Sequence, residues 1–166
     1  FLVALLAFLF GASGRFLGFG IFVLLSGFCD FIDGQYARGS NQKTTFGAFL
    51  DSTLDRYSDF FFFASLIIAF ADGTHRVMLV VTLFATIGTG VLSYIRARAL
   101  SLGWDLPYGY FQRESRIVLL GGAGVLSLFT PLILFLVLWV LALGTNASVF
   151  QMISGLKAKV EAPHSQ

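Results

Sequence analysis

The sequence predicts an all-α integral membrane protein with six transmembrane helices in a single bundle. Hydrophobic residues make up 57% of the 166 positions and charged residues only 12%, whereas soluble domains carry about 25% charged residues. Long apolar runs alternate with short polar segments, and basic residues gather in alternate segments. No linker or charge run divides the chain, so residues 1–166 are expected to form one domain.

The apolar runs near the N-terminus predict the first two helices. The first helix should end near residue 11. Residues 1–10 would span about 15 Å as a helix, half of a bilayer core, so we expect this helix to be truncated and the natural N-terminus to be missing. Residues 15–38 would span about 35 Å, which is enough to cross a membrane.

Polar and capping residues divide the remainder into four helices. Thr44 or Thr45 is expected to cap a third helix that ends near residue 71, and a fourth should occupy residues 77–102. The apolar stretch from residue 117 to 143 is too long for one untilted span. Thr130 and Pro131 divide it, because Thr caps helices and Pro favours the first helical position. The predicted fifth and sixth helices therefore cover residues 111–129 and 131–153.

The basic residues fit this six-span topology. Only Arg15 and Arg76 fall on one side of the predicted membrane, and the other nine of the eleven basic residues fall on the opposite side. These nine are Arg38, Lys43, Arg56, Arg96, Arg98, Arg113, Arg116, Lys157 and Lys159. Cytoplasmic segments are enriched in Lys and Arg. We therefore expect the second and third helices to meet at the cytoplasmic face. The membrane is expected to be a prokaryotic cell (inner) membrane.

Four aspartates lie where those two helices meet. Asp30 and Asp33 are three residues apart and Asp51 and Asp55 four apart, so each pair shares one helix face. The polar loop between them would bring both pairs to one point. Four convergent carboxylates need positive charge between them, and an all-oxygen set without Cys or His suits a hard divalent cation. Acidic clusters that are simply solvated at the membrane surface remain the alternative.

The aspartates belong to a longer pattern, Asp-x2-Asp-Gly-x2-Ala-Arg-x8-Gly-x3-Asp-x3-Asp, that begins at residue 30. This pattern resembles the signature of the CDP-alcohol phosphotransferase family. The resemblance implies a membrane enzyme of phospholipid biosynthesis, often a homodimer, in which an acceptor hydroxyl displaces CMP from a CDP-alcohol. It also implies Mg2+ or Mn2+ at Asp30, Asp33, Asp51 and Asp55, with Asp55 as general base, and CDP binding at Gly34, Ala37, Arg38 and Gly47.

Four further arginines predict an anionic acceptor. Guanidinium groups suit bidentate phosphate binding, so we expect Arg96, Arg98, Arg113 and Arg116 to hold an acceptor phosphate. Residues 93–99 resemble the Ser-Tyr-x-Lys-Ala-Arg-Ala segment of phosphatidylinositol-phosphate synthases, and residues 112–116 resemble their Glu-Arg-x-x-Arg. The chain departs from this pattern at three positions: Arg96 stands where Lys is usual, Leu100 follows the first segment where Glu is usual, and Gln112 replaces a Glu. The resemblance implies transfer from CDP-diacylglycerol to inositol phosphate, with glycerol 3-phosphate or another polar acceptor as the alternative. An ordinary belt of charge against anionic lipid would also explain the arginines.

The acidic residues also allow a different class of function, and one of them has a different expected role. Intramembrane carboxylates could form a divalent-cation transporter, but the acidic residues cluster near one membrane face, which favours an enzyme. Asp59 continues the spacing of Asp51 and Asp55, and we expect it to form a salt bridge with a neighbouring arginine rather than to bind metal. Membrane lipid is an expected partner, and nucleic acid is not.

Overall fold

The computed structural model describes residues 1–39, 44–105 and 111–161, and only the backbone of residues 33–39. This part of the chain forms six α-helices and no strand. The helices are α1 (Leu2–Ala12), α2 (Phe16–Gly39), α3 (Thr45–Ala69), α4 (Arg76–Ser101), α5 (Arg113–Leu126) and α6 (Pro131–Glu161). Each predicted helix is present. Helix α5 is shorter than expected at both ends, and α6 continues well past the predicted residue 153.

The capping residues explain two of the helix starts. The Thr44 hydroxyl accepts a hydrogen bond from the Gly47 amide at 3.0 Å, which satisfies one of the unpaired amides of the first turn of α3. The Thr130 hydroxyl accepts from the Leu132 amide at 3.3 Å, and Pro131 is the first residue of α6. Both features agree with the sequence prediction.

Helix α6 is extended by polar contacts at its C-terminal end. Lys159 Nζ donates to the carbonyl oxygen of Asp105 at 2.9 Å, which ties the helix to the segment after α4. Lys157 and Glu161 also form an ion pair at 3.8 Å, four residues apart. These contacts favour continued helix beyond the point where the apolar pattern ends.

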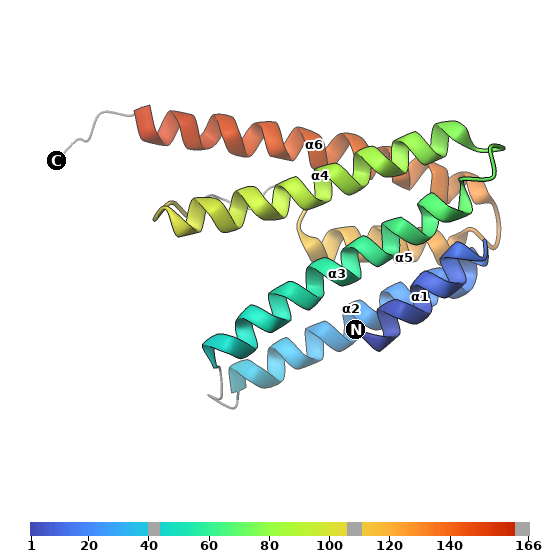
Figure 1. Ribbon diagram of the computed structural model, residues 1–166, viewed down its shortest axis with the longest axis horizontal. Helices are drawn as coiled ribbons and strands as arrows, with labels where there is room; N and C mark the ends of the chain where they lie inside the picture. Colours follow the sequence, from blue (N-terminus) through green and yellow to red (C-terminus); the bar gives the residue numbers. More distant parts are fainter. Residues whose placement is uncertain (40–43, 106–110, 162–166) are drawn as a thin grey trace.

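The helices run alternately up and down (Figure 1). The α1–α2, α3–α4 and α5–α6 connections lie at one end of the molecule. The C-terminal end of α2 and the N-terminal end of α3 lie together at the other end. Because the motif aspartates occur at these two helix ends, this topology brings them to the same region of the molecule.

The helices pack in two sets: α1, α2, α3 and α5 form one, and α4 and α6 form the other. Helix α2 approaches α5 so closely that a Cβ atom at Gly124 would lie 2.7 Å from the Cα atom of Gly20. Helix α4 packs mainly on α6, where Asn146 Nδ2 donates to the Phe84 carbonyl at 3.0 Å. Contacts of α3 with α4, and of α5 with α6, are less extensive. Figure 1 shows the α4–α6 pair diverging from α2 and α3 toward the end that carries the aspartates.

The surface is rich in large apolar side chains. Phe84, Phe129, Leu143 and Phe150 are more than half exposed, as are many others along the helices. Within the described residues, α4 and α6 are long and apolar enough to cross a membrane, and α1 and residues 16–32 of α2 are shorter apolar helices. Exposed apolar surface on this scale is typical of a protein that contacts lipid.

Candidate active site

The described aspartates become progressively more buried along α3. Asp51 is exposed, the Asp55 side chain is 20% exposed and that of Asp59 is 7% exposed. Their spacing of four residues places them on one face of the helix. Asp30 on α2 lies close to the same face, because it shares a partner with Asp55. The predicted convergence of the two acidic segments is therefore observed for Asp30 and Asp55, whereas the Asp33 side chain lies outside the described part.

That shared partner is Arg113, in the first turn of α5. Its Nη2 atom lies 2.8 Å from Asp30 Oδ2 and 3.0 Å from Asp55 Oδ1. Its Nε atom lies 3.3 Å from Asp59 Oδ1. One guanidinium thus joins α2, α3 and α5. It supplies positive charge between two carboxylates whose like charges repel each other.

The carboxylates expected to bind metal have the chemistry that a divalent cation requires. Among the described side chains, no three carboxylate, histidine or cysteine groups surround a common point. However, Asp30 and Asp55 already converge on a single cationic nitrogen, and carboxylate oxygens are the ligands that magnesium and manganese prefer. The assignment of Asp30, Asp33, Asp51 and Asp55 as metal ligands remains a prediction.

Asp59 is a buried carboxylate that contacts three arginines, of which Arg116 is equally buried. Its carboxylate lies 3.3 Å from Arg113, 3.3 Å from Arg116 and 3.7 Å from Arg56. A buried carboxylate requires such partners, because an isolated buried charge is strongly unfavourable. The expectation that Asp59 forms a salt bridge with a neighbouring arginine is confirmed.

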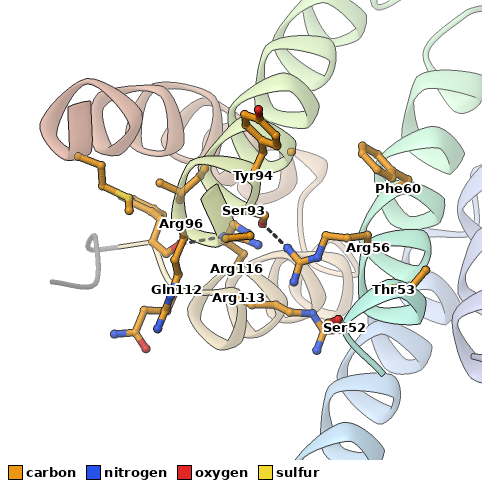
Figure 2. Close-up of a pocket in the computed structure, with 15 residues that line it drawn as sticks. Ser52, Thr53, Arg56, Phe60, Ser93, Tyr94, Arg96, Gln112, Arg113 and Arg116 are labelled. Carbon is orange, nitrogen blue, oxygen red and sulfur yellow. Dashed lines mark hydrogen bonds between the residues drawn. The ribbon is translucent and has the colours of Figure 1, made fainter. Parts of the chain in front are cut away.

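A cavity of about 500 Å³ opens beside this network, between α3, α4 and the start of α5. Figure 2 shows that arginines from all three helices surround it. Arg56 donates to the Ser93 hydroxyl and so connects α3 to α4 across the cavity wall. Arg116 Nη1 donates to the Phe111 carbonyl at 2.8 Å, which fixes its guanidinium in place. The polar lining comprises Ser52, Thr53, Arg56, Ser93, Arg96, Gln112, Arg113 and Arg116.

Three of the four arginines expected at the acceptor site line this cavity, namely Arg96, Arg113 and Arg116. Arg98 lines a second cavity between α4 and α6, together with Lys157. The helix explains the separation, since residues two positions apart point about 200° apart around an α-helix. Arg98 therefore lies apart from the other three arginines of the expected acceptor site.

Arg56, Ser52 and Gln112 also line the cavity but were not assigned to it from the sequence. A signal for Arg56 was present, because it lies three residues before Asp59 and can pair with it on one helix face. Nothing comparable marked Ser52. Its position became apparent only when α3 and α4 were placed side by side.

Of the positions expected to bind CDP, only Gly47 has a described environment. It is exposed in the first turn of α3, and a Cβ atom there would lie 2.8 Å from the Thr44 hydroxyl. The small residue therefore leaves room for the helix cap. Gly34, Ala37 and Arg38 belong to α2, but their side chains lie outside the described part.

Sequence comparisons support the resemblance to the CDP-alcohol phosphotransferase family. The family model for CDP-alcohol phosphatidyltransferases matches residues 1–153. Phosphatidylinositol phosphate synthase from Streptomyces avermitilis is 32% identical over 156 residues, which cover 89% of this chain and 64% of the relative. Archaetidylinositol phosphate synthase from Methanothermobacter thermautotrophicus is 40% identical over 120 residues, covering 72% of this chain and 59% of the relative. The chain thus spans less than two thirds of the length of these two relatives.

Solved structures give the same result. The Mycobacterium tuberculosis phosphatidylinositol phosphate synthase with CDP-DAG bound superimposes with a TM-score of 0.85 at 27% identity, over 93% of this chain and 80% of that one. The same enzyme in complex with manganese and citrate gives a TM-score of 0.86 at 28% identity, over 93% and 77% of the two chains. Motif, fold and family model agree, and the chain belongs to the CDP-alcohol phosphatidyltransferase family of membrane transferases.

Proposed function

We propose that this chain transfers a phosphatidyl-type group from a CDP-alcohol, such as CDP-diacylglycerol, to a hydroxyl of inositol phosphate and releases CMP. One observation carries the proposal: an arginine-lined cavity lies directly beside the motif aspartates, and Arg113 belongs to both. The relatives named phosphatidylinositol phosphate synthase and archaetidylinositol phosphate synthase support the same acceptor.

The donor half of the proposed site is formed by α2 and α3. Asp30, Asp33, Asp51 and Asp55 would hold Mg2+ or Mn2+, and manganese in the related M. tuberculosis structure supports this choice. When bound, the ion neutralises the pyrophosphate and makes CMP a better leaving group. Gly34, Ala37, Arg38 and Gly47 would contact the CDP group, as the family motif implies.

The acceptor half is the cavity between α3, α4 and α5. Its volume of about 500 Å³ accommodates a polyol phosphate, and Arg96, Arg113 and Arg116 offer charge-assisted hydrogen bonds to the phosphate. The acceptor hydroxyl would then reach Asp55, which borders the same network. Asp55 would take the hydroxyl proton while the oxygen bonds to the lipid-side phosphorus and the bond from that phosphorus to CMP breaks.

The acceptor is tested by measuring CMP release from CDP-diacylglycerol in detergent with a panel of acceptors. We expect inositol phosphate to support turnover and unphosphorylated inositol to support little, because an uncharged acceptor gains little from the arginines. Turnover with glycerol 3-phosphate alone would retain the proposed chemistry and replace the acceptor. Turnover with free inositol equal to that with its phosphate would refute the proposed role of the cavity.

We also propose that all six helices cross a prokaryotic cell membrane, with the site facing the cytoplasm. The alternation of the helices and the predicted location of nine of the eleven basic residues on one side support this orientation. A homodimer is proposed by analogy with the family, and cross-linking of the protein in native membranes would test it.

A further inference from the structure

Arg113 occupies the boundary between the two halves of the proposed site. Its side chain is 15% exposed and contacts Asp30 and Asp55 through the same Nη2 atom, while it also lines the arginine-rich cavity. Both carboxylates belong to the expected metal ligands. The same guanidinium therefore has partners on the donor side and a position from which it can reach an anion on the acceptor side.

A divalent cation and this guanidinium compete for the same oxygens. A cation on Asp30 and Asp55 would repel the positive charge of Arg113, because like charges a few ångströms apart in a partly buried site are only weakly screened by water. The Nε contact with Asp59, at 3.3 Å, lies outside that pair and does not involve a proposed ligand. Asp59 can therefore retain the side chain when the Nη2 contacts are lost.

We propose that Arg113 couples the two halves of the site: metal binding releases its Nη2 group from Asp30 and Asp55, and Asp59 retains the side chain so that it turns to the acceptor phosphate. This proposal rests on the proposed function. Metal and phosphate then strengthen each other's binding by the same factor, as linkage requires. The acceptor binds well only once the donor side is loaded.

The coupling is tested through metal affinity rather than turnover. Mn2+ binding to the purified protein in detergent is measured from the EPR signal of the free ion, with and without inositol phosphate. Complexes between Mn2+ and inositol phosphate are measured in protein-free buffer and subtracted. We expect inositol phosphate to tighten Mn2+ binding to the wild-type protein.

Arg113→Gln should tighten Mn2+ binding about tenfold, within the range typical of coupled sites, and should abolish most of the effect of inositol phosphate. A purely structural role for Arg113 predicts the opposite sign, because a disturbed site binds metal more weakly. Arg56→Gln is the matched control: it removes the same charge from the same cavity, but Arg56 contacts Ser93 and Asp59, which are not proposed metal ligands. Its effect on Mn2+ affinity should be much smaller. Arg76→Gln, at the far end of α4, should have none.

The outcomes separate the coupling from the proposed function. Mn2+ binding that is unchanged in Asp30→Asn would overturn the metal site and the coupling with it. Binding that depends on Asp30 but is unchanged or weaker in a folded Arg113→Gln protein would overturn the coupling alone. If Arg113→Gln does not fold, the wild-type protein decides: absence of mutual strengthening between Mn2+ and inositol phosphate overturns the proposal.

Discussion

Arg116 donates from Nη2 to Asp59 Oδ2 at 3.3 Å, and the two side chains are 6% and 7% exposed. This buried ion pair joins α5 to α3 at the cavity that Arg116 lines. Asp59 also contacts Arg56 and Arg113, so the charges of three guanidinium groups depend on one carboxylate. The pair is therefore expected to contribute to stability, in contrast to Asp51 and Asp55, which are more exposed and lie nearer the N-terminal end of α3.

Asp59→Asn should destabilise the protein by about 3 kcal/mol, because removing one partner of a buried ion pair leaves an uncompensated charge. The measurement is the thermal unfolding midpoint in detergent, which should fall by several degrees. Asp51→Asn is the control on the same helix face, since Asp51 is exposed, and its midpoint should match the wild type. Equal midpoints for the two variants would contradict the structural role of Asp59.

Asp51→Asn and Asp55→Asn should each reduce CMP release by about 10²-fold or more, the effect expected when a metal ligand or general base is lost. Both proteins should retain wild-type elution on gel filtration. Chelation by EDTA should abolish wild-type activity, and Mn2+ or Mg2+ should restore it. Activity that survives chelation would exclude the proposed metal dependence.

Arg96→Gln should raise the KM for inositol phosphate about tenfold or more, the equivalent of one charge-assisted hydrogen bond, while the KM for CDP-diacylglycerol changes little. Arg98→Gln is the matched control, because Arg98 lies on the same helix but lines the other cavity. Steady-state kinetics with each substrate varied in turn provide the comparison. Equal effects of the two substitutions would mean that the acceptor is not confined to the cavity beside Asp55.

Gly124→Ala should destabilise the packing of α2 on α5 by about 1–3 kcal/mol, the usual cost of overpacking. The new methyl group would meet backbone atoms of Gly20 and Phe16 at 2.7–2.9 Å, and backbone cannot move aside as a flexible side chain can. Gly122→Ala is the control, because a Cβ atom at Gly122 has no neighbour within 4 Å among the described residues. The unfolding midpoint should fall only in the first variant.

Cysteine labelling in a Cys29→Ala background should place Ser40→Cys on the cytoplasmic side and Ala71→Cys on the opposite side. Ala71 suits this test because it is exposed after α3, whereas nearby Gly73 has a φ of 86° that disfavours a side chain. A membrane-impermeant maleimide added to intact cells and to inverted vesicles distinguishes the two sides. Labelling of both cysteines from the same side would refute the six-span topology.

Local sequence signals predicted most of the fold. The Thr44 cap and the Thr130–Pro131 boundary depend on neighbouring residues in the chain, and the structure confirms both. The extension of α6 to Glu161 was not predicted, because the apolar pattern ends near residue 153 and the contacts made beyond it, such as that of Lys159 with Asp105, come from a distant part of the chain. Hydrophobic periodicity carries no information about such a contact.

The site was also predictable only in part, because some of its contacts join residues far apart in the chain. The spacing of the aspartates showed which carboxylates share a face, and the convergence of Asp30 with Asp55 followed from the short connection between their helices. The partnership of Arg113 with these carboxylates depends on how α5 packs against α2, a helix far away in the chain, and on the ion pairs that join Arg113 to α3. Arg96 and Arg98 could not be separated by composition, but their angular positions on α4 place them at different cavities.

The limited contact between the α4–α6 pair and the α2–α3 hairpin has an evolutionary consequence. In the proposed function the hairpin carries the donor chemistry, while α4 and the start of α5 provide most of the acceptor wall. A few substitutions on α4 could therefore change the alcohol that is accepted without disturbing the motif that activates the nucleotide. Such a division would let one ancestral scaffold diversify into enzymes that attach different head groups to membrane lipids.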